Sequence, residues 1–356
     1  MKVCILGYGL TSLTLAKALV NQGLKVDVFL KNYNLIQNKS RTLGISKSNI
    51  EFFNENILNI EKLLWDIKKI EIYSENSNSE SILNFQNNNQ KLFSIIKNYK
   101  LSNLLLSNLK KNKLFNLKKQ VDYNDLVKKN YKLIINSDPS SEISKKFFYK
   151  KIKKNYYSNA FITIIKHKKI KNDTAIQIFT SVGPLAFLPI SETKTSIVYS
   201  VRGKEQIDLF NLINKYNKKY EILNIAKPYK FEINSLNLRS YYYKNILAFG
   251  DLLHKLHPLA GQGFNMSIRD IKKLLEIINN KIELGLPLDK NVCIEFENET
   301  KNQNFIFSEG IDFVYESFNS NNKLKSNFID RTVKLIGKNK SVNRYLVKIA
   351  DAGLSF

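Results

Sequence analysis

The stretch GDLLHKLHPLAGQGFN, residues 250–265, decides the fold of this chain of 356 residues. The apolar run just before it, at 246–249, predicts a buried strand. After it, residues 265–278 carry apolar side chains at helical spacing, which predicts a helix. A glycine-rich loop therefore leads into a helix N-terminus, where backbone N–H groups and the helix dipole favour a phosphorylated or planar ligand.

The first thirty residues show a second pattern of this kind. An apolar strand at 2–6 is followed by GYGLTS at 7–12, a helix that Gly23 ends, and a second strand at 25–30. In such a unit the first glycine makes a tight turn and the second leaves room for a pyrophosphate. Ser12 is small enough for the third position. An ordinary glycine turn is the alternative, but the complete strand–turn–helix–strand context favours a dinucleotide-binding unit.

Taken together, the two loops resemble class A FAD-dependent aromatic monooxygenases, and within them the hydroxylases of ubiquinone biosynthesis, which have the fold of para-hydroxybenzoate hydroxylase. Three further stretches agree with this resemblance, namely 41–46 (RTLGIS), 183–189 (GPLAFLP) and the tail at 350–354 (ADAGL). The residues of the main loop that carry the resemblance are Gly250, Asp251, His254, His257, Pro258, Gly261, Gln262, Gly263 and Asn265, with Asp270 in the following helix.

The resemblance implies FAD as cofactor and NAD(P)H as cosubstrate. It implies a flavin-ring loop, where the catalytic positions are Pro258, Gly261, Gln262 and Gly263. It implies cofactor-binding positions at Gly7, Gly9, Ser12, Arg41, Gly250, Asp251, Gly263 and Asn265. The expected reaction is hydroxylation of the aromatic ring of a polyprenylated phenol, with NAD(P)H and dioxygen.

Two departures support an alternative function. Leu30 stands where the second strand normally ends in an acid that binds the adenosine ribose. Pro139 follows Asp138 where the family has Asp-Gly, and proline has a fixed φ and no N–H. The alternative is a catalytically degenerate, flavoprotein-like accessory subunit that binds lipid or partner proteins of the same pathway.

The composition limits the partners. The chain carries 56 Lys and Arg against 31 Asp and Glu, for a net charge of +25, but only six of the basic residues are arginine. Because nucleic-acid readers favour arginine, we expect no nucleic-acid partner. The positive charge suits contact with anionic membrane. The resemblance implies, in addition, contact with a ubiquinone-biosynthesis complex. No run is long and apolar enough for a transmembrane helix, and no signal peptide is evident. The expected location is cytoplasmic, with peripheral attachment to the inner membrane face considered.

The expected fold class is α/β, a Rossmann-like FAD-binding domain interrupted by an antiparallel β-sheet substrate domain. We assign 1–70, 95–147 and 240–290 to the first domain, 71–94 and 148–239 to the second, and 291–356 to a helical C-terminal region. Within the second domain, a helix is expected over 206–223.

The histidines allow other interpretations. Asp251, His254 and His257 spell Asp-x-x-His-x-x-His, a set of residue types that suits zinc or iron. Because the proline and glycines make this a loop, we favour a packing or hydrogen-bonding role for His254 and predict no metal. His167 lies among lysines, and we expect it to be exposed to solvent.

Overall fold

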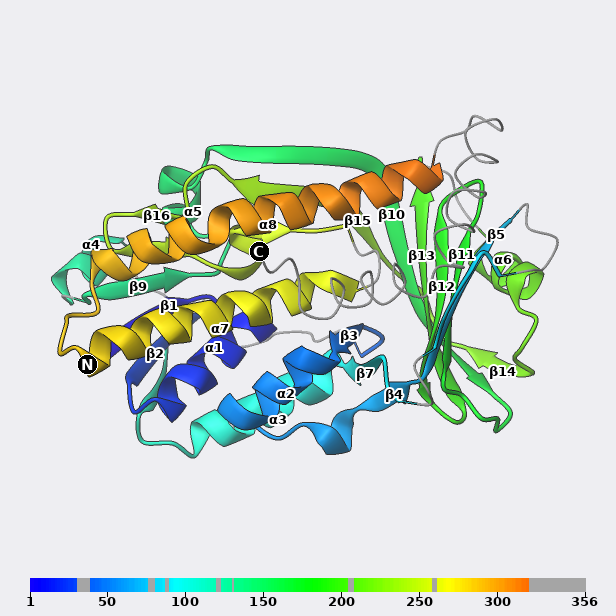
Figure 1. Cartoon of the computed structure of the whole chain (residues 1–356), viewed down its shortest axis with the longest axis horizontal. Coiled ribbons are helices and arrows are strands. Elements are labelled where there is room, and N and C mark those ends of the chain that lie inside the picture. Colours follow the sequence, from blue (N-terminus) through cyan, green and yellow to red (C-terminus); the bar gives the residue numbers. More distant parts are fainter. Residues whose placement is uncertain are drawn as a thin grey trace.

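The computed structural model of the chain describes residues 1–30, 39–75, 81–86, 90–119, 123–129, 131–203, 208–257 and 261–319. One half of the molecule is a sheet covered by helices, and the other half is a large, strongly twisted sheet (Figure 1). Pro258 and the tail at 350–354 lie outside the described residues.

The first half is built on a six-stranded sheet in the order β16-β17-β9-β1-β2-β8. All neighbouring strands are parallel except β16 and β17. Its strands are β1 (Lys2–Leu6), β2 (Lys25–Leu30), β8 (Phe115–Lys119), β9 (Leu133–Asn136), β16 (Tyr242–Tyr243) and β17 (Ile246–Ala248). Helix α1 (Leu10–Asn21) connects β1 to β2, so the predicted strand–helix–strand unit is confirmed.

Helices bury their apolar faces against this sheet and against each other. Helix α1 packs against α3 (Asn98–Lys110) and α7 (Gln262–Glu283). The apolar positions that predicted α7 are all buried in the main core, namely Ile268, Ile271, Leu274, Leu275 and Ile278. The shorter helices are α2 (Lys47–Asn56), α4 (Tyr123–Lys128) and α5 (Glu142–Phe147).

The second half is a nine-stranded sheet in the order β18-β15-β10-β13-β12-β11-β5-β6, with β14 also paired to β10. Its neighbouring strands are antiparallel except for the parallel pair β5 and β11. The strands are β5 (Lys69–Ser74), β6 (Leu83–Gln86), β10 (Lys151–His167), β11 (Thr174–Phe179), β12 (Pro184–Ser191), β13 (Lys194–Arg202), β14 (Ile222–Ile225), β15 (Tyr229–Leu238) and β18 (His254–Lys255). The α/β fold class with an inserted antiparallel sheet is therefore confirmed.

The helix expected over 206–223 is wrong in length. Helix α6 covers only Leu209–Tyr216, and β14 begins at Ile222. Residues 222–225 pair with the end of β10, so a long-range strand contact replaces the local helical pattern there. Helix α6 itself packs on the nine-stranded sheet through Leu209 and Ile213, within a second apolar core.

A small three-stranded sheet lies between the two halves. It consists of β3 (Thr42–Ser46), β7 (Phe93–Lys97) and β4 (Trp65–Ile67), and the short 3-10 turn η1 (Glu61–Leu63) precedes β4. Trp65 Nε1 donates a hydrogen bond of 2.7 Å to the Asn172 carbonyl, and Thr42 Oγ1 donates one of 3.0 Å to Ser196 Oγ. This sheet is thereby attached to the strands of the larger sheet.

Among the described segments that connect the two halves are the glycine-rich stretch and helix α8 (Lys290–Asn319). The stretch that opened the sequence analysis leaves β17, makes the 3-10 turn η2 (Gly250–Leu252) and then enters the larger sheet as β18. Helix α8 runs along the top of both halves in Figure 1. The domain boundaries expected from the sequence stay a prediction.

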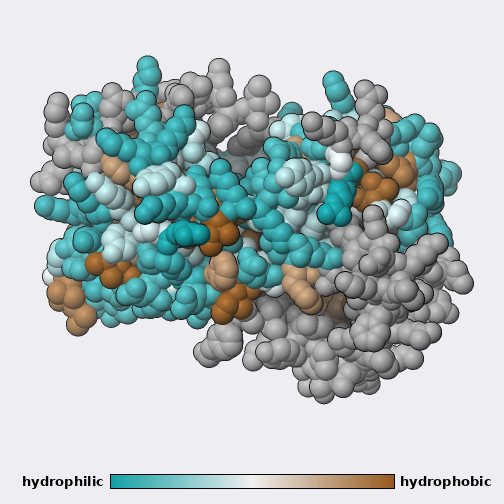
Figure 2. All heavy atoms as spheres, turned by 90° about the horizontal axis from the view of Figure 1, so that it is seen from above, coloured by the Kyte–Doolittle hydropathy of each residue, from teal (hydrophilic) through white to brown (hydrophobic). Residues whose placement is uncertain are grey.

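The described part of the chain contains no helix with the length and apolarity needed to cross a membrane. On the face seen from above, the coloured atoms are mostly hydrophilic, and hydrophobic residues are scattered in small areas (Figure 2).

Candidate functional site

The carboxyl ends of β1 and β9 meet the start of α1 in a closely packed turn. Gly7 has a φ of +109°, and a Cβ at this position would lie 2.5 Å from Ser137 Oγ. Ser137 Oγ donates to the Leu6 carbonyl at 3.0 Å and lies 2.5 Å from Ser12 Oγ. Glycine is therefore required at position 7, and the serine at position 12 fixes the helix to the end of β9.

The N-terminus of α1 is open to a ligand. Its N-cap residue is Gly9, which supplies no side-chain cap, and the first turn contains no acidic residue. A Cβ on Gly9 would meet nothing within 4 Å. Among the described residues, no side chain caps the first N–H groups at the positive end of this helix dipole, which is the arrangement that binds phosphate.

The turn at Gly250 closes onto the same helix end. Gly250 has a φ of +59°, and a Cβ there would lie 3.1 Å from Thr11 Cγ2. The next residue, Asp251, is exposed, and the described residues give its carboxylate no hydrogen bond or ion pair. An acid beside an uncapped helix N-terminus is available to accept hydrogen bonds from the hydroxyl groups of a ligand.

The loop at the start of α7 is held against β3. Gly261, the N-cap, has a φ of +64°, and a Cβ on it would lie 3.3 Å from the Gly44 nitrogen. Asn265 Oδ1 accepts from the Ser46 N–H at 3.0 Å and from Asn49 Nδ2 at 3.1 Å, and its Nδ2 donates to the Gly44 carbonyl at 3.0 Å. The Asn265 side chain therefore positions the loop.

Two further predicted loop residues, Gln262 and Gly263, lie in the first turn of α7. A Cβ on Gly263 would meet nothing within 4 Å. The Gln262 Oε1 atom is buried and, within the part of the chain that the structure describes, has no hydrogen-bond partner. An unpartnered buried acceptor and an open glycine at a helix N-terminus without a side-chain cap fit a planar ligand that carries hydrogen-bond donors.

Three further positions, at Arg41, Leu30 and Asp138, were expected near the pyrophosphate and adenosine of FAD. The Arg41 side chain is exposed, and its carbonyl accepts from the Asn98 N–H at 3.0 Å. Leu30, at the end of β2, is buried in place of an acid that would face a ribose. The carboxylate of Asp138, just before Pro139, accepts from the N–H and hydroxyl of Ser140 at 2.9 and 2.7 Å.

Two histidines of the loop are buried but serve different packing roles. His254 Nε2 forms a hydrogen bond with the Asp270 carboxylate, and Asn304 Nδ2 donates to the same carboxylate at 3.0 Å. His257 lies against the ring of Tyr315 with a centroid distance of 3.9 Å and meets Tyr156 edge-on at 5.0 Å. Burial lowers the pKa of His257 to about 3. Among the described residues, no three His, Cys, Asp or Glu side chains are grouped to hold a metal.

The expectation that His167 is exposed is wrong. Its side chain is buried, with Nδ1 at 2.8 Å from the Lys168 carbonyl and Nε2 at 3.0 Å from Thr195 Oγ1. Successive residues of a strand face opposite sides, so the lysines beside His167 in sequence point away from it.

The sequence analysis missed a polar stripe on α8. Asn304, Ser308 and Asp312 are buried at intervals of four residues and face the loop and the larger sheet. Asn304 contacts Asp270, Ser308 accepts from Asn237 Nδ2 at 2.9 Å, and Asp312 accepts from the Tyr156 hydroxyl. The spacing of four was visible in the sequence, but the partners lie far away along the chain.

No family model matches the chain. Among curated proteins it is similar to the 3-demethoxyubiquinol 3-hydroxylase of Escherichia coli, with 26% identity over 176 residues, 47% of this chain and 45% of the relative. It is also similar to the mitochondrial ubiquinone biosynthesis monooxygenase COQ6 of Danio rerio, with 23% identity over 53% of this chain and 49% of the relative. The chain spans about half the length of these two curated relatives.

Solved structures match over nearly the whole chain. The p-nitrophenol 4-monooxygenase PnpA of Pseudomonas putida gives a TM-score of 0.79 at 12% identity, covering 97% of this chain and 96% of its own. Klebsiella pneumoniae HpxO, solved with FAD and uric acid, gives 0.74 at 11% identity and covers 98% of this chain and 96% of its own. The resemblance inferred from the sequence is thus confirmed, because the chain is similar to ubiquinone-pathway hydroxylases and has the fold of flavin-dependent monooxygenases.

Proposed function

We propose that this protein is an FAD-dependent monooxygenase that hydroxylates the aromatic ring of a polyprenylated phenol in ubiquinone biosynthesis, using NAD(P)H and dioxygen. The observation that carries the proposal is a pair of helix N-termini without side-chain caps: that of α1, against which the turn at Gly250 packs, and that of α7, which is held against Gly44 of β3. The similarity to ubiquinone-pathway hydroxylases supports the substrate class.

The residues around this turn suit the two ends of FAD. Gly7, Gly9 and Ser12 at the start of α1 would hold the pyrophosphate, and Arg41, just before β3, would approach it. Asp251 would accept hydrogen bonds from the ribityl hydroxyls, because its carboxylate is exposed beside that helix end. Gln262 and Gly263 would border the flavin ring, and Asn265 would keep them in place through its bonds to Gly44 and Ser46.

When bound, FAD would supply the redox chemistry with dioxygen, since amino-acid side chains cannot. The protein would contribute position and charge. The N-terminal N–H groups of α7 would stabilise negative charge at the adjacent end of the ring. The larger sheet, joined to the loop through β18, would cover the substrate and exclude water.

An accessory subunit that has lost turnover is the second candidate, and Leu30 favours it. This buried leucine cannot accept a hydrogen bond from an adenosine ribose. In this alternative the chain would keep the fold and bind lipid or a partner protein of the same pathway.

The decisive experiment is the absorbance spectrum of the purified protein after incubation with FAD and desalting. We expect a flavin spectrum, and NADH or NADPH oxidation that is stimulated by a prenylated phenol. A protein that remains colourless and retains no FAD would refute the monooxygenase proposal. Retained FAD without phenol-dependent oxidation would favour the accessory subunit.

Asp251→Ala tests the assigned site within the same assay. We expect it to lower FAD retention about tenfold or more, because hydrogen bonds to a charged group contribute about 1.5–3 kcal/mol. Glu55→Ala is the matched control, since Glu55 is an exposed acid on α2. Equal retention in the two variants would remove Asp251 from the site.

A further inference from the structure

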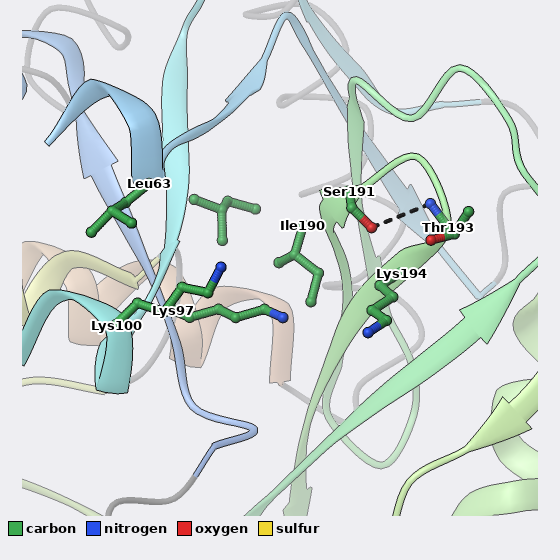
Figure 3. Close-up of a pocket in the computed structure, with 8 residues that line it drawn as sticks. Leu63, Lys97, Lys100, Ile190, Ser191, Thr193 and Lys194 are labelled. Carbon is green, nitrogen blue, oxygen red and sulfur yellow. Dashed lines mark hydrogen bonds between the residues drawn. The ribbon is translucent and has the colours of Figure 1, made fainter. Parts of the chain in front are cut away.

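A pocket lies between the three-stranded sheet and the larger sheet. It has a volume of about 260 Å³. One wall comes from β7 and the start of α3, and the other from the turn between β12 and β13 (Figure 3). The lining residues are Leu63, Ile95, Lys97, Lys100, Ile190, Ser191, Thr193 and Lys194.

Three lysines converge on this pocket from both walls. Lys97 and Lys100 reach in from one side, and Lys194 lies on the other (Figure 3). Across the described residues, none of the three forms an ion pair, whereas many other lysines of the chain pair with Asp or Glu. The pocket therefore concentrates three positive charges with no carboxylate to balance them.

The charges influence each other. Lys97 is half-buried, and burial, followed by the charges of Lys194 and Lys100, lowers its pKa. Like charges gathered in a partly dehydrated pocket cost free energy, and a bound anion would offset that cost.

Other groups in the pocket suit a phosphate with an uncharged part attached. Ser191 and Thr193 bring two hydroxyls, and Ser191 Oγ accepts from the Thr193 N–H at 3.2 Å, which fixes the turn (Figure 3). Leu63, Ile95 and Ile190 form an apolar surface beside the lysines. A concave site of this kind fits a small molecule better than the flat surface of a membrane.

We propose that Lys97, Lys100 and Lys194 form a binding site for the phosphate group of a small anionic molecule, whose uncharged part contacts Leu63, Ile95 and Ile190. The site contains none of the residues assigned to FAD. It goes beyond the proposed function and does not depend on it.

The test is calorimetric titration of the full chain with inorganic pyrophosphate at low salt, with and without added FAD. We expect binding in both cases, weakened by high salt. In the triple variant Lys97→Gln, Lys100→Gln, Lys194→Gln, the affinity for pyrophosphate should fall about tenfold or more. The reason is that the loss of even one charged hydrogen bond to the phosphate lowers the affinity by about that factor. The matched control replaces Lys110, Lys111 and Lys113, three exposed lysines at the end of α3, by glutamine.

Equal affinity in the triple variant and its control would overturn the proposal, as would the absence of pyrophosphate binding to the wild type. A second arm uses phosphatidylglycerol vesicles in a flotation assay. Vesicle binding that the three lysines control, without pyrophosphate binding, would assign them to a membrane surface and also overturn it. Should the triple variant not fold, the single variant Lys194→Glu, at an exposed position, is expected to weaken pyrophosphate binding.

Discussion

His254 and Asp270 form a buried hydrogen bond that joins strand β18 to the middle of helix α7. The two residues lie on either side of the glycine-rich loop, so the bond closes this loop at its base. Asn304 of α8 donates to the same carboxylate, which brings a third element to the same point. The position of the candidate flavin loop thus depends on a polar contact between the two halves of the molecule.

Asp270→Ala should therefore destabilise the whole fold. The substitution leaves His254 and Asn304 buried without their acceptor, and we expect the free energy of unfolding to fall by about 3 kcal/mol. Urea denaturation followed by circular dichroism measures this. Glu276→Ala, at a surface position of the same helix where Glu276 pairs with Lys273, should change it by less than about 1 kcal/mol. A similar loss in both variants would show that the contact contributes little.

Gly263→Ala should separate cofactor binding from folding. Gly263 lies within the first turn of α7, and a Cβ there meets no protein atom within 4 Å. Alanine in a helix is favoured over glycine by up to about 1 kcal/mol, so stability should hold or rise. FAD retention should fall, because the added methyl group enters the space proposed for the flavin. Thermal unfolding and absorbance after desalting give the two readouts.

Gly310→Ala is the control for this variant. Gly310 lies inside α8, where a Cβ also meets nothing within 4 Å. It should gain similar stability and keep its FAD retention. If Gly263→Ala and Gly310→Ala retain FAD equally, the flavin does not approach the start of α7.

The burial of His257 predicts a pH dependence of stability. Its pKa is about 3 in the folded protein, because burial disfavours the charged ring, against about 6.5 in the unfolded chain. Below pH 6.5 His257 binds a proton in the unfolded chain, whereas in the folded protein it stays neutral until the pH approaches 3. Stability is therefore fully present above pH 6.5 and declines as the pH falls towards 3, by about 2 kcal/mol at pH 5.

His257→Phe isolates this effect, because phenylalanine preserves an aromatic ring between Tyr156 and Tyr315 but has no titratable group. Denaturation curves at pH 7, 6 and 5 should show a smaller decline in the variant than in the wild type. Parallel declines would mean that His257 takes up its proton in the folded protein as well.

The fold could be predicted from the sequence because its deciding signals are local. The unit from β1 to β2 is encoded in thirty consecutive residues, and the glycines at 250, 261 and 263 mark the turns around α7. The helix predicted over 206–223 was wrong in length because β14 forms only through its pairing with β10, between residues as distant in sequence as Ile165 and Ile225.

The backbone turns of the candidate site could be predicted from the sequence, but the side-chain contacts that hold them in place could not. Glycine positions reveal where the chain turns with a positive φ, so the turns at Gly250 and Gly261 could be predicted from the sequence, while their roles toward a cofactor stay a prediction. The contacts of Asn265 with Gly44 and Ser46 span more than two hundred residues. Such pairs depend on how α7 packs on β3, and no local pattern encodes that packing.

Asp27 is a buried acid in the otherwise apolar strand β2. Its buried carboxylate accepts hydrogen bonds from Lys118 Nζ at 2.6 Å, Asn116 Nδ2 at 3.1 Å and the Tyr131 hydroxyl, and Lys2 Nζ lies at 2.9 Å. Burial alone would raise the pKa of Asp27, but these donors outweigh it and lower the pKa to about 2. The group therefore stabilises the fold above pH 4, and this contribution is lost as the pH falls towards 2.

Asp27→Asn removes the charge while nearly preserving the shape of the side chain. We expect the free energy of unfolding at pH 7 to fall by about 2–3 kcal/mol, because the lysines and Tyr131 lose a charged acceptor. The variant should also lose less stability than the wild type between pH 4 and pH 2. Glu55→Gln, the same chemical change at an exposed position of α2, should leave both measurements close to wild type. A variant as stable as wild type at pH 7 would mean that desolvation of the carboxylate cancels the benefit of its donors.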